Sequence, residues 1–415
     1  MGDMTGTETH VIVGGGQAGG RAAETLRSAG FAGRIVIVAG EPVRPYERPP
    51  LSKQVLTGEA ADDSVFLRSP AYYSEHGIEV LTETSAEALD RTGKVLSLSD
   101  GEVLRYDKLL LATGARVRRL PVAGGDLRGV HYLRTLRDSA ALRPELAPGR
   151  RILIVGGGYI GLEVAAAAIK RGCDVTVLEA ADSVMNRQVA PELGEWFAHW
   201  HRGRGVDLHT GMRVAAFEGE DGHVARVACA DGQSFAADTV VVGVGVVPNA
   251  ELAAEAGVTC DDGIVVDAFG RTDDPAVFAA GDVTRHHNPV LDRWMRLESW
   301  QNAQYQSETA AKTMADSPTQ YAMVPWFWSD QYDINLQMIG QPETWDRVVW
   351  RGDPESGDGF SVFYLAEGRV VGANTVNLGR DIAPARKMIE TGVRPDPALL
   401  ADTDTTLKKV LKAAG

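Results

Sequence analysis

The sequence predicts an α/β protein with two similar nucleotide-binding domains, followed by an antiparallel α+β domain. Residues 10–26 (HVIVGGGQAGGRAAETL) and 151–167 (RILIVGGGYIGLEVAAA) each place a glycine turn between a β-branched run and an Ala/Leu-rich stretch. A further buried-strand run follows each segment, at 34–38 and at 174–178. This βαβ pattern occurs twice, about 140 residues apart, and predicts two Rossmann-like domains of similar design.

The later part of the chain changes its pattern near residue 325. Runs at 109–112 (LLLA) and 239–242 (TVVV) still predict parallel strands of the two domains. Beyond residue 325, short strands alternate with turn residues without intervening helices, and a helix is expected near 405–413. This pattern predicts the antiparallel domain. Its expected strands are 334–339, 347–350, 360–364 and 370–373.

Composition excludes several classes of function. The 415 residues are 44% hydrophobic and 24% charged, an ordinary globular composition, and no window approaches the ~18 apolar residues of a membrane span. The net charge of −14 disfavours nonspecific nucleic-acid binding. Residues 1–10 lack the basic flank and apolar core of a signal peptide, and three cysteines lie far apart without a CxxC pair. We expect a cytoplasmic protein without a disulfide framework or metal site.

The first glycine motif is Gly14-x-Gly16-x-x-Gly19. Its first glycine permits a tight turn, its second lets a pyrophosphate approach the backbone, and its third allows close packing of helix on strand. An isolated GxGxxG also fits an ordinary glycine-rich turn. Its βαβ context and its repetition favour a dinucleotide site.

The second motif, Gly156-x-Gly158-x-x-Gly161, has a carboxylate, Glu179, at the end of its second strand. Such a carboxylate accepts hydrogen bonds from the adenosine ribose and repels a 2′-phosphate, so the motif predicts NADH over NADPH. The alternative is a solvated glutamate at a strand end. At the first site the nearest acid is Glu41, one place later than expected, and we predict it as the ribose ligand.

Two nucleotide sites imply either two substrates or a bound flavin with a nicotinamide. Residues 106–115 (YDKLLLATGA) place a strand before a small-residue turn that can pass beneath a cofactor. Residues 277–283 (VFAAGDV) place Asp282 after a glycine, where we expect the start of a helix and a contact with a ribityl hydroxyl. Together they favour the flavin.

Nearly the whole chain resembles a known family. GGGQAGG, PPLSK, LLLATGA, GGGYIGLE, GVGVVPN and AAGD resemble the two-dinucleotide-binding flavoproteins of glutathione-reductase architecture. Within them, YERPPLSK, YLRTL, RLESWQNA and PWFWSDQY resemble the ferredoxin reductases of bacterial oxygenases, of the putidaredoxin and rhodocoxin reductase type. The dithiol branch of this architecture carries CxxxxC on its first helix and the peroxidase branch a cysteine near residues 42–46, and this sequence has neither.

The resemblance implies two cofactor sites, position by position. The residues implied to bind FAD are Gly14, Gly16, Ala18, Gly19, Glu41, Arg48, Lys53, Ala86, Ala112, Thr113, Gly114, Arg134, Asp282 and Trp300. The residues implied to bind NADH are Gly156, Gly158, Ile160, Gly161, Glu163, Glu179 and Gly245. The residues implied to act in catalysis are Lys53 near the flavin ring, Glu163 and Glu298 at the nicotinamide, and Trp328 toward the ferredoxin. We predict that Lys53 and Glu163 form an ion pair that joins the two nucleotide-binding domains.

The resemblance also implies a domain plan. Residues 1–115 and 246–325 would form the FAD domain, 116–245 the NADH domain and 326–415 an interface domain. The sequence departs from the family at two positions. Relatives usually carry an acid at the position of Gly40, and the putidaredoxin reductase type has an arginine of its docking face at the position of Glu308.

The implied activity is an FAD-dependent ferredoxin–NAD+ reductase. NADH would give a hydride to FAD, and single electrons would pass to a small acidic [2Fe–2S] ferredoxin that serves a haem-thiolate monooxygenase. Three alternatives remain open: a reductase of a Rieske dioxygenase, an NADH oxidase or peroxidase, and an NADH sensor of the apoptosis-inducing-factor kind. The absence of the peroxidase cysteine weighs against the second.

The C-terminal segment is the expected docking face. Residues 369–415 contain eight basic and five acidic side chains and carry +3, whereas the remainder carries −17. A local basic face steers an acidic partner. The lysines expected there are Lys387, Lys408, Lys409 and Lys412. We expect a monomer or a weak homodimer.

Overall fold

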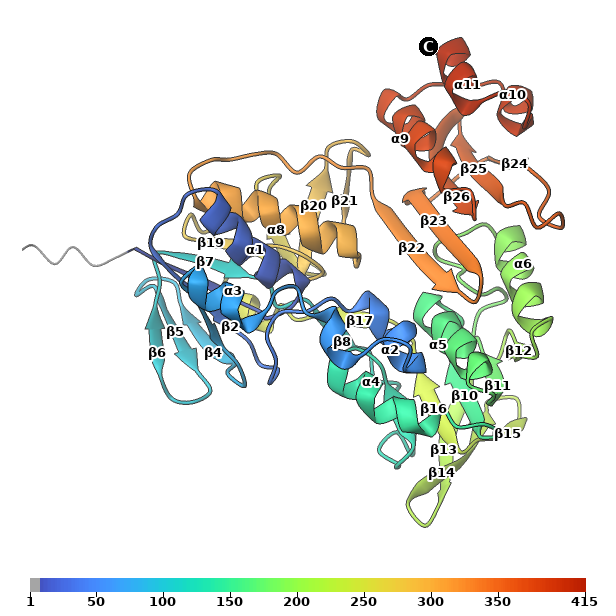
Figure 1. The fold of residues 1–415 in the computed structure, drawn as a ribbon, viewed down its shortest axis with the longest axis horizontal. Coiled ribbons are helices and arrows are strands. Elements are labelled where there is room, and N and C mark those ends of the chain that lie inside the picture. The colour runs from blue at the N-terminus through green and yellow to red at the C-terminus, as the bar shows by residue number, and fades with distance from the viewer. Residues whose placement is uncertain (1–7) are drawn as a thin grey trace, which may run out of the picture. The chain divides into compact units, whose positions relative to one another are not determined.

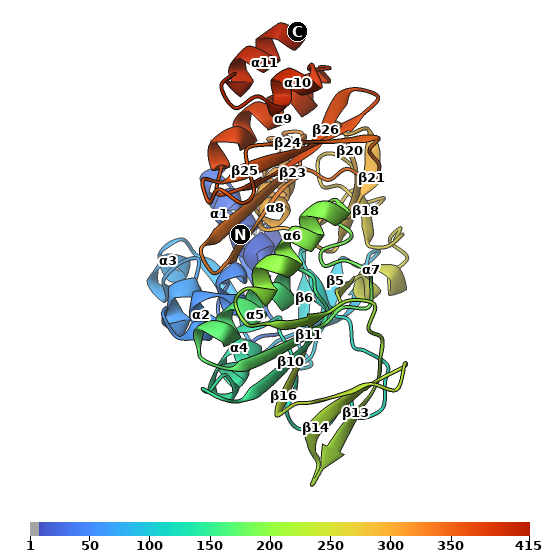
Figure 2. The same ribbon diagram turned by 90° about the vertical axis from the view of Figure 1, so that its right-hand side faces the viewer.

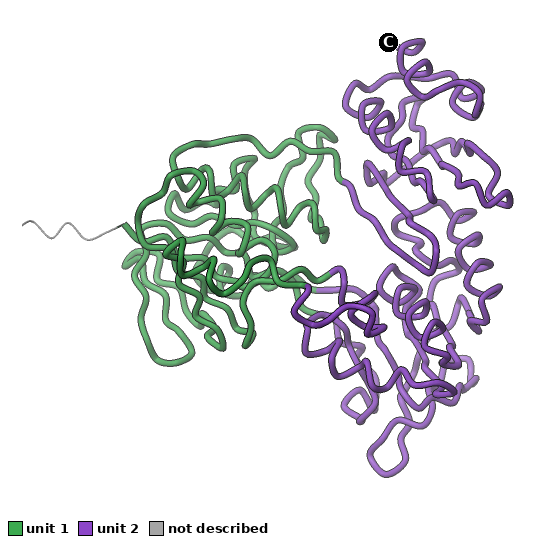
Figure 3. Tube along the Cα trace, in the orientation of Figure 1, with its two compact units in different colours: residues 1–48, 65–116, 247–325 green, residues 49–64, 117–246, 326–415 purple. Residues whose placement is uncertain are grey.

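The structure is a computed structural model that describes residues 8–415. Residues 1–7, which belong to the segment 1–10 predicted not to be a signal peptide, lie outside the described residues. The chain forms two compact units, shown in Figure 3: unit 1 contains the residues up to 48 with 65–116 and 247–325, and unit 2 contains 49–64, 117–246 and 326–415. No helix within residues 8–415 is long and apolar enough to cross a membrane.

Unit 1 is built on a five-stranded parallel sheet in the order β19-β7-β1-β2-β3. The buried faces of its strands consist largely of Val, Ile and Leu, as expected of a sheet covered on both sides. Helices α1 (Gln17–Ser28) and α8 (Trp300–Met314) lie side by side in this unit (Figure 1). The strands are β1 (Thr9–Val13), β2 (Arg34–Val38), β3 (Ile78–Leu81), β7 (Lys108–Leu111) and β19 (Val277–Ala279).

Smaller elements complete unit 1. One antiparallel sheet joins β4, β5 and β6, and a second sheet joins β18, β20 and β21. The strands are β4 (Ala86–Asp90), β5 (Val95–Leu98), β6 (Val103–Arg105), β18 (Ile264–Val266), β20 (Thr284–Asn288) and β21 (Arg293–Met295). The short helices are α3 (Pro70–Glu75) and α7 (Glu251–Glu255). Strands β8 (Ala115–Val117) and β17 (Val246–Pro248) lie where the chain passes from one unit to the other.

Unit 2 repeats the design, with a parallel sheet in the order β12-β11-β10-β16-β9. Its strands are β9 (Val130–Tyr132), β10 (Arg151–Val155), β11 (Asp174–Leu178), β12 (Asp207–His209) and β16 (Thr239–Val242). A meander of β13 (Val214–Glu220), β14 (His223–Cys229) and β15 (Ser234–Ala236) is attached to it. The helices of this part are α2 (Gln54–Thr57), α4 (Leu136–Leu142), α5 (Tyr159–Lys170) and α6 (Pro191–Arg202).

The C-terminal part of unit 2 is the predicted antiparallel sheet, in the order β22-β23-β26-β25-β24. Its strands are β22 (Trp326–Gln331), β23 (Ile334–Gly340), β24 (Arg347–Arg351), β25 (Phe360–Ala366) and β26 (Arg369–Val376). Strand β22 is not among the strands that the sequence predicts. Three helices follow the sheet in Figures 1 and 2, which are α9 (Ile382–Thr391), α10 (Pro397–Ala401) and α11 (Leu407–Ala414), and only α11 was predicted.

One hydrophobic core holds unit 2 together. Ile152 and Leu162 of the nucleotide-binding part belong to the same buried cluster as Leu336 and Phe360 of the C-terminal sheet. The chain changes unit at residues 116/117, 246/247 and 325/326, close to the expected domain boundaries, and also at 48/49 and 64/65. The three-domain assignment stays a prediction.

Candidate functional site

The first glycine motif lies between β1 and α1 of unit 1. Gly14 has a φ of +126°, and a Cβ placed on it would lie 2.1 Å from the carbonyl oxygen of Ala112. A Cβ on Gly19 would lie 1.9 Å from the carbonyl oxygen of Gly14. Neither position can therefore hold a larger residue, because the turn packs directly against the neighbouring strand and the helix against the turn.

The second motif has the same geometry in unit 2. Gly156 has a φ of +109°, and its added Cβ would lie 2.4 Å from the carbonyl oxygen of Gly243. A Cβ on Gly161 would lie 2.0 Å from the carbonyl oxygen of Gly156. Gly243 is thus the counterpart of Ala112. The segment 243–245 (GVG) is therefore the counterpart of the segment 112–114 (ATG).

Both motifs are shaped to receive a pyrophosphate. An added Cβ on Gly16 or Gly158 would meet no described atom within 4 Å, so the backbone is open at the middle glycine of each motif. These glycines are the N-caps of the twelve-residue helices α1 and α5, and no side chain of the described residues caps either helix. Helix N-termini attract anions, so both cradles fit the diphosphate of a dinucleotide such as FAD or NADH.

The carboxylate of Glu179 is hydrogen-bonded to the glycine loop of the second motif. Its Oε2 accepts a hydrogen bond from the Gly157 N–H at 2.6 Å, and its Oε1 accepts one from the Ala181 N–H at 2.7 Å. These bonds fix the carboxylate at the end of β11, beside the glycine loop, where an adenosine ribose would meet it.

The first motif has no carboxylate at the equivalent position, which corrects the expected register. Gly14 N–H donates to Val38 O and Gly156 N–H donates to Leu178 O, both at 2.8 Å. Glu179 follows Leu178 directly, so its counterpart is Ala39, and Glu41 lies two places beyond that position rather than one.

Glu41 has partners in its own loop. Its Oε1 accepts from Arg48 at 2.7 Å and its Oε2 accepts from the Tyr46 hydroxyl at 2.6 Å. A ribose hydroxyl would therefore share an oxygen that already carries a hydrogen bond. The predicted contact of Glu41 with FAD stays a prediction, and the structure adds the role of holding Arg48.

Two motifs far apart in the sequence join beside the first fingerprint. Thr113 Oγ1 donates to Asn249 O at 2.7 Å, and Asn249 Nδ2 donates to Thr113 O at 2.9 Å. Asn249 N–H also donates to Gly114 O at 2.9 Å. Asn249 thus fixes the turn Ala112–Gly114, a role that the sequence analysis did not assign to it.

The helix expected at Asp282 is absent from the described part of the chain. Residues 281–283 form a turn, in which Gly281 has a φ of +85° and Thr284 N–H bonds to Gly281 O at 3.0 Å. The chain then enters β20, which pairs with β18 on one side and β21 on the other. Pairing on both edges favours the extended backbone, so the prediction of a helix N-terminus at Asp282 was wrong.

A buried carboxylate on α5 is held by three side chains. Glu163 is 3% exposed, and its Oε2 lies 2.9 Å from Lys53 Nζ and 2.5 Å from the Ser52 hydroxyl. Its Oε1 accepts from the Ser329 hydroxyl at 2.6 Å. The expected ion pair between Lys53 and Glu163 is confirmed. Both residues lie in unit 2, so the pair does not join the two units as predicted. Neither serine was predicted from the sequence. Ser52 lies in the PPLSK motif, which could have indicated it, whereas nothing in the sequence connects Ser329 with Glu163.

Three other predicted residues lie at the ends of elements. Glu298 pairs with Arg296 in unit 1, and Trp300 begins α8 behind the N-cap Ser299. Arg134 lies just before the capping box of α4, and its backbone N–H donates to Asp138 at 3.1 Å.

Trp328 belongs to an ordered pair of indoles on β22. Its ring stacks on that of Trp326 at 5.2 Å between centroids, and its Nε1 donates to Asp330 at 3.1 Å. Trp326 Nε1 donates to Gln337 Oε1 at 3.2 Å. Alternate residues of β22 lie on opposite faces, so the indoles lie on one face and Ser329 on the other.

The four predicted docking lysines are exposed on two neighbouring helices. Lys387 is on α9, and Lys408, Lys409 and Lys412 are on α11, which packs on α9. The buried Leu407 and Val410 turn the opposite side of α11 inward.

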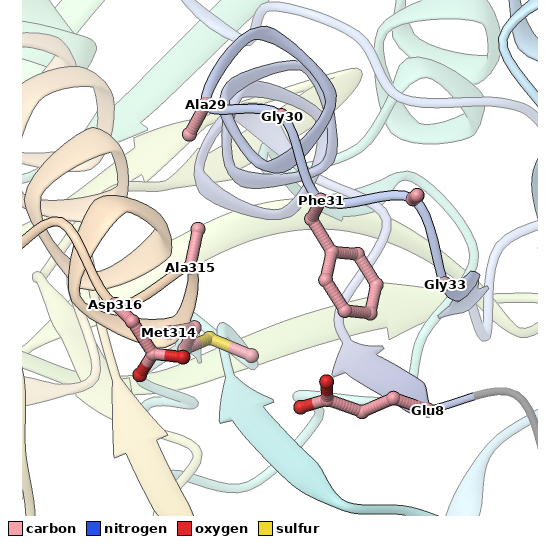
Figure 4. A pocket seen from close by; sticks show the side chains of 9 residues that line it. Glu8, Ala29, Gly30, Phe31, Gly33, Met314, Ala315 and Asp316 are labelled. Carbon is pink, nitrogen blue, oxygen red and sulfur yellow. The ribbon is translucent and has the colours of Figure 1, made fainter.

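The hollow drawn in Figure 4 lies away from these sites. Its volume is about 420 Å³, and it is lined by Glu8, the segment 29–33 and the segment 314–316. Glu8 precedes β1, so this hollow is at the amino end of the strand. Dinucleotides bind at the carboxyl ends of parallel strands, so this hollow is not part of the cofactor site.

The three cysteines are not paired. Cys173 and Cys229 are buried, Cys260 is partly buried, and burial raises the pKa of each thiol.

Comparisons with known proteins agree with this architecture. A family model described as pyridine nucleotide-disulphide oxidoreductase matches residues 8–307, and one described as reductase C-terminal matches residues 326–411.

Individual relatives match along nearly the whole chain. The putidaredoxin reductase CamA of Pseudomonas putida is 42% identical over 99% of this chain and 98% of its own. The ferredoxin–NAD(+) reductase component of the anthranilate 1,2-dioxygenase system of Burkholderia cepacia is 45% identical over 97% of this chain and 98% of its own. The solved covalent putidaredoxin reductase–putidaredoxin complex matches with a TM-score of 0.95 at 42% identity, over 98% of this chain and 99% of that one. The chain therefore belongs to the pyridine nucleotide-disulphide oxidoreductase family and, within it, to the ferredoxin–NAD(+) reductases, flavoenzymes that use FAD and NAD(H).

Proposed function

We propose that this reductase carries electrons from NADH through FAD to a small acidic [2Fe–2S] ferredoxin that serves a haem-thiolate monooxygenase. The observation that carries the proposal is the pair of glycine cradles with equal geometry, of which only the second has a carboxylate, Glu179, at the ribose position. FAD, when bound, accepts two electrons as a hydride and releases them one at a time.

The residues of unit 1 would hold FAD. The backbone N–H groups at the start of α1 would bind the diphosphate, and the turn Ala112–Gly114, fixed by Asn249, would contact the cofactor. The family resemblance adds Arg48, Ala86, Asp282 and Trp300 from this unit, and Arg134 from unit 2.

The residues of unit 2 would hold NADH and support hydride transfer. The start of α5 would bind the diphosphate, and Glu179 would accept a hydrogen bond from the ribose. The family resemblance assigns both Glu163 and Glu298 to the nicotinamide amide. Lys53 would supply positive charge near the reacting ring, where negative charge develops.

The partner assignment rests on the relatives and on charge. The solved complex joins putidaredoxin reductase to putidaredoxin, and the exposed lysines of α9 and α11 offer an acidic ferredoxin a basic surface. A second candidate is the reductase of a dioxygenase, because the Burkholderia relative belongs to such a system at 45% identity. Trp326 and Trp328 belong to the PWFWSDQY motif, which favours the monooxygenase type.

Anaerobic stopped-flow spectroscopy tests the proposal. NADH should bleach the flavin rapidly, and reoxidation should require an added [2Fe–2S] ferredoxin, with putidaredoxin and a Rieske-dioxygenase ferredoxin as the two probes. A faster reaction with the dioxygenase ferredoxin would move the assignment to the second candidate. Reduced enzyme that is not reoxidised by any ferredoxin would contradict the electron-transfer function and favour an NADH sensor.

A further inference from the structure

We propose that Ser329, on strand β22 of the C-terminal sheet, is a positioning residue for hydride transfer because it holds the buried carboxylate of Glu163. This inference deepens the proposed function and rests on it. It assigns to the C-terminal sheet a part in the NADH half-reaction, in addition to its predicted role in docking the ferredoxin.

The two oxygens of Glu163 are bound by different parts of unit 2. Oε2 accepts from Ser52 and pairs with Lys53, both from the segment before α2, whereas Oε1 accepts from Ser329 at 2.6 Å. Removal of the Ser329 hydroxyl would leave Oε1 without its described donor, whereas Oε2 would keep both Ser52 and Lys53. Because a buried carboxylate with a missing donor reorients or recruits water, the direction of its free lone pairs would change.

Ser329 is itself held by a buried chain of hydrogen bonds. Gln331 Nε2 donates to Ser329 Oγ at 3.1 Å, and Gln331 Oε1 lies 2.8 Å from His201 Nε2 on α6. Ser329, Gln331 and His201 are each 0% exposed. Burial lowers the pKa of His201 to about 4, so its ring is neutral at neutral pH and donates from Nε2 to Gln331.

The donors in this series of hydrogen bonds point toward Glu163, as the positioning role of Ser329 requires. Gln331 uses its amide to donate to the Ser329 oxygen, which leaves the single hydroxyl proton of Ser329 to be donated to Glu163. The alternate faces of β22 separate this function from the indoles, since Trp326 and Trp328 lie on the other face of the strand.

The same sheet contains a matched control. Ser361 on β25 is also 0% exposed, and its hydroxyl donates to a buried carboxylate, Asp381, at 2.8 Å. Arg351 Nε lies 3.6 Å from the same carboxylate, so Asp381 also has a cationic partner. Ser361→Ala therefore removes an equivalent buried hydrogen bond without touching Glu163.

The test compares Ser329→Ala, Ser329→Thr and Ser329→Cys with Ser361→Ala in the FAD-loaded enzyme. Three quantities are measured: the limiting rate of flavin reduction at saturating NADH, the dissociation constant of NAD+ from the shift in flavin absorbance, and the thermal unfolding midpoint. Threonine keeps the hydroxyl and suits a strand, whereas a thiol is a weak donor. The cysteine variant also decides the question if the alanine variant does not fold.

We expect Ser329→Ala to slow flavin reduction about tenfold, the loss expected for one hydrogen bond to a charged group, and to change the NAD+ dissociation constant by less than about threefold. Ser329→Thr should retain the wild-type rate within about twofold, Ser329→Cys should be slow, and Ser361→Ala should lower the unfolding midpoint while keeping the wild-type rate. A rate in Ser329→Ala or Ser329→Cys equal to that of Ser361→Ala would overturn the proposal. Failure of the wild-type enzyme to be reduced by NADH would instead refute the proposed function.

Discussion

Glu179 is held by the protein backbone and is predicted to contact the cofactor. Its two oxygens bind the N–H groups of Gly157 and Ala181, which fixes the carboxylate beside the glycine loop. A fixed negative charge at the ribose position repels the 2′-phosphate of NADPH, and neither Ala180 nor Ala181 offers a compensating cation.

We predict that kcat/KM for NADH exceeds that for NADPH by at least about tenfold, which corresponds to roughly 1.4 kcal/mol. Glu179→Ala should narrow this ratio, because it removes the charge as well as the ribose acceptor. Steady-state dye reduction with both nucleotides measures the effect, and Glu195→Ala, at an exposed position of α6, is the control. Equal efficiencies in the wild-type enzyme would contradict the assignment.

Glu41 of the first site, in contrast, lies two residues beyond the position equivalent to Glu179. Its oxygens hold Arg48 and Tyr46, so its loss would release a cation predicted to lie along FAD. We predict that Glu41→Ala loosens FAD, seen as flavin lost on dialysis. Glu102→Ala, at an exposed site of unit 1, serves as the control. Retention equal to that of the wild type would mean that backbone groups suffice to hold the ribose.

At the scale of an element, the C-terminal helix α11 has one buried apolar side and one exposed basic side. Leu407 and Val410 are buried beneath it, whereas Lys408, Lys409 and Lys412 are exposed. The nearby buried Arg351 donates to the carbonyl oxygens of Leu400 and Thr405, at 3.1 and 2.9 Å, which ties the segment before α11 to β24.

Charge reversal on α11 should therefore weaken docking without unfolding the helix. We predict that Lys408→Glu with Lys409→Glu lowers the rate of ferredoxin reduction at low salt about tenfold and flattens its salt dependence, because steering by surface charge is screened over about 10 Å at 0.1 M salt. Ferricyanide reduction should be unchanged. Lys94→Glu, in the β4–β5 turn, provides the control for net charge. If ferredoxin reduction stays at the wild-type level at both salt concentrations, the ferredoxin docks elsewhere.

For the molecule as a whole, two buried histidines contribute to its sensitivity to acid. Burial lowers the pKa of both His201 and His286 to about 4, below their ordinary value of 6.5, so the folded chain keeps both rings neutral. Their contribution to stability is fully present above pH 6.5 and is lost as the pH falls from 6.5 toward 4, because the unfolded chain binds the protons first.

We predict that the free energy of unfolding decreases by about 2 kcal/mol for each histidine between pH 7 and pH 5. Guanidinium unfolding of the wild type and of His201→Gln at the two pH values measures this loss. The variant should lose less stability on acidification than the wild type. An identical loss in both would show that His201 is not the group that titrates.

Local sequence patterns determined the two nucleotide folds and most of their binding loops. A β-branched run, three spaced glycines and an Ala-rich helix form a unit whose geometry depends on neighbouring residues, and Gly14 and Gly156 adopt the same turn. Two expectations that depended on exact register or on a local helix signal were wrong. Glu41 lies two places beyond the position equivalent to Glu179, where one place was expected. Asp282 precedes a strand because β18 and β21 pair with both edges of β20.

Only the tertiary structure decided the surroundings of Glu163. The sequence predicted its pairing with Lys53 through a family resemblance, but Ser329 and His201 lie 166 and 38 residues away from it along the chain. Their hydrogen bonds form because one hydrophobic core packs α5, α6 and the C-terminal sheet together. Such contacts leave no periodic signal in the sequence, since each depends on side chains that meet only after the chain has folded.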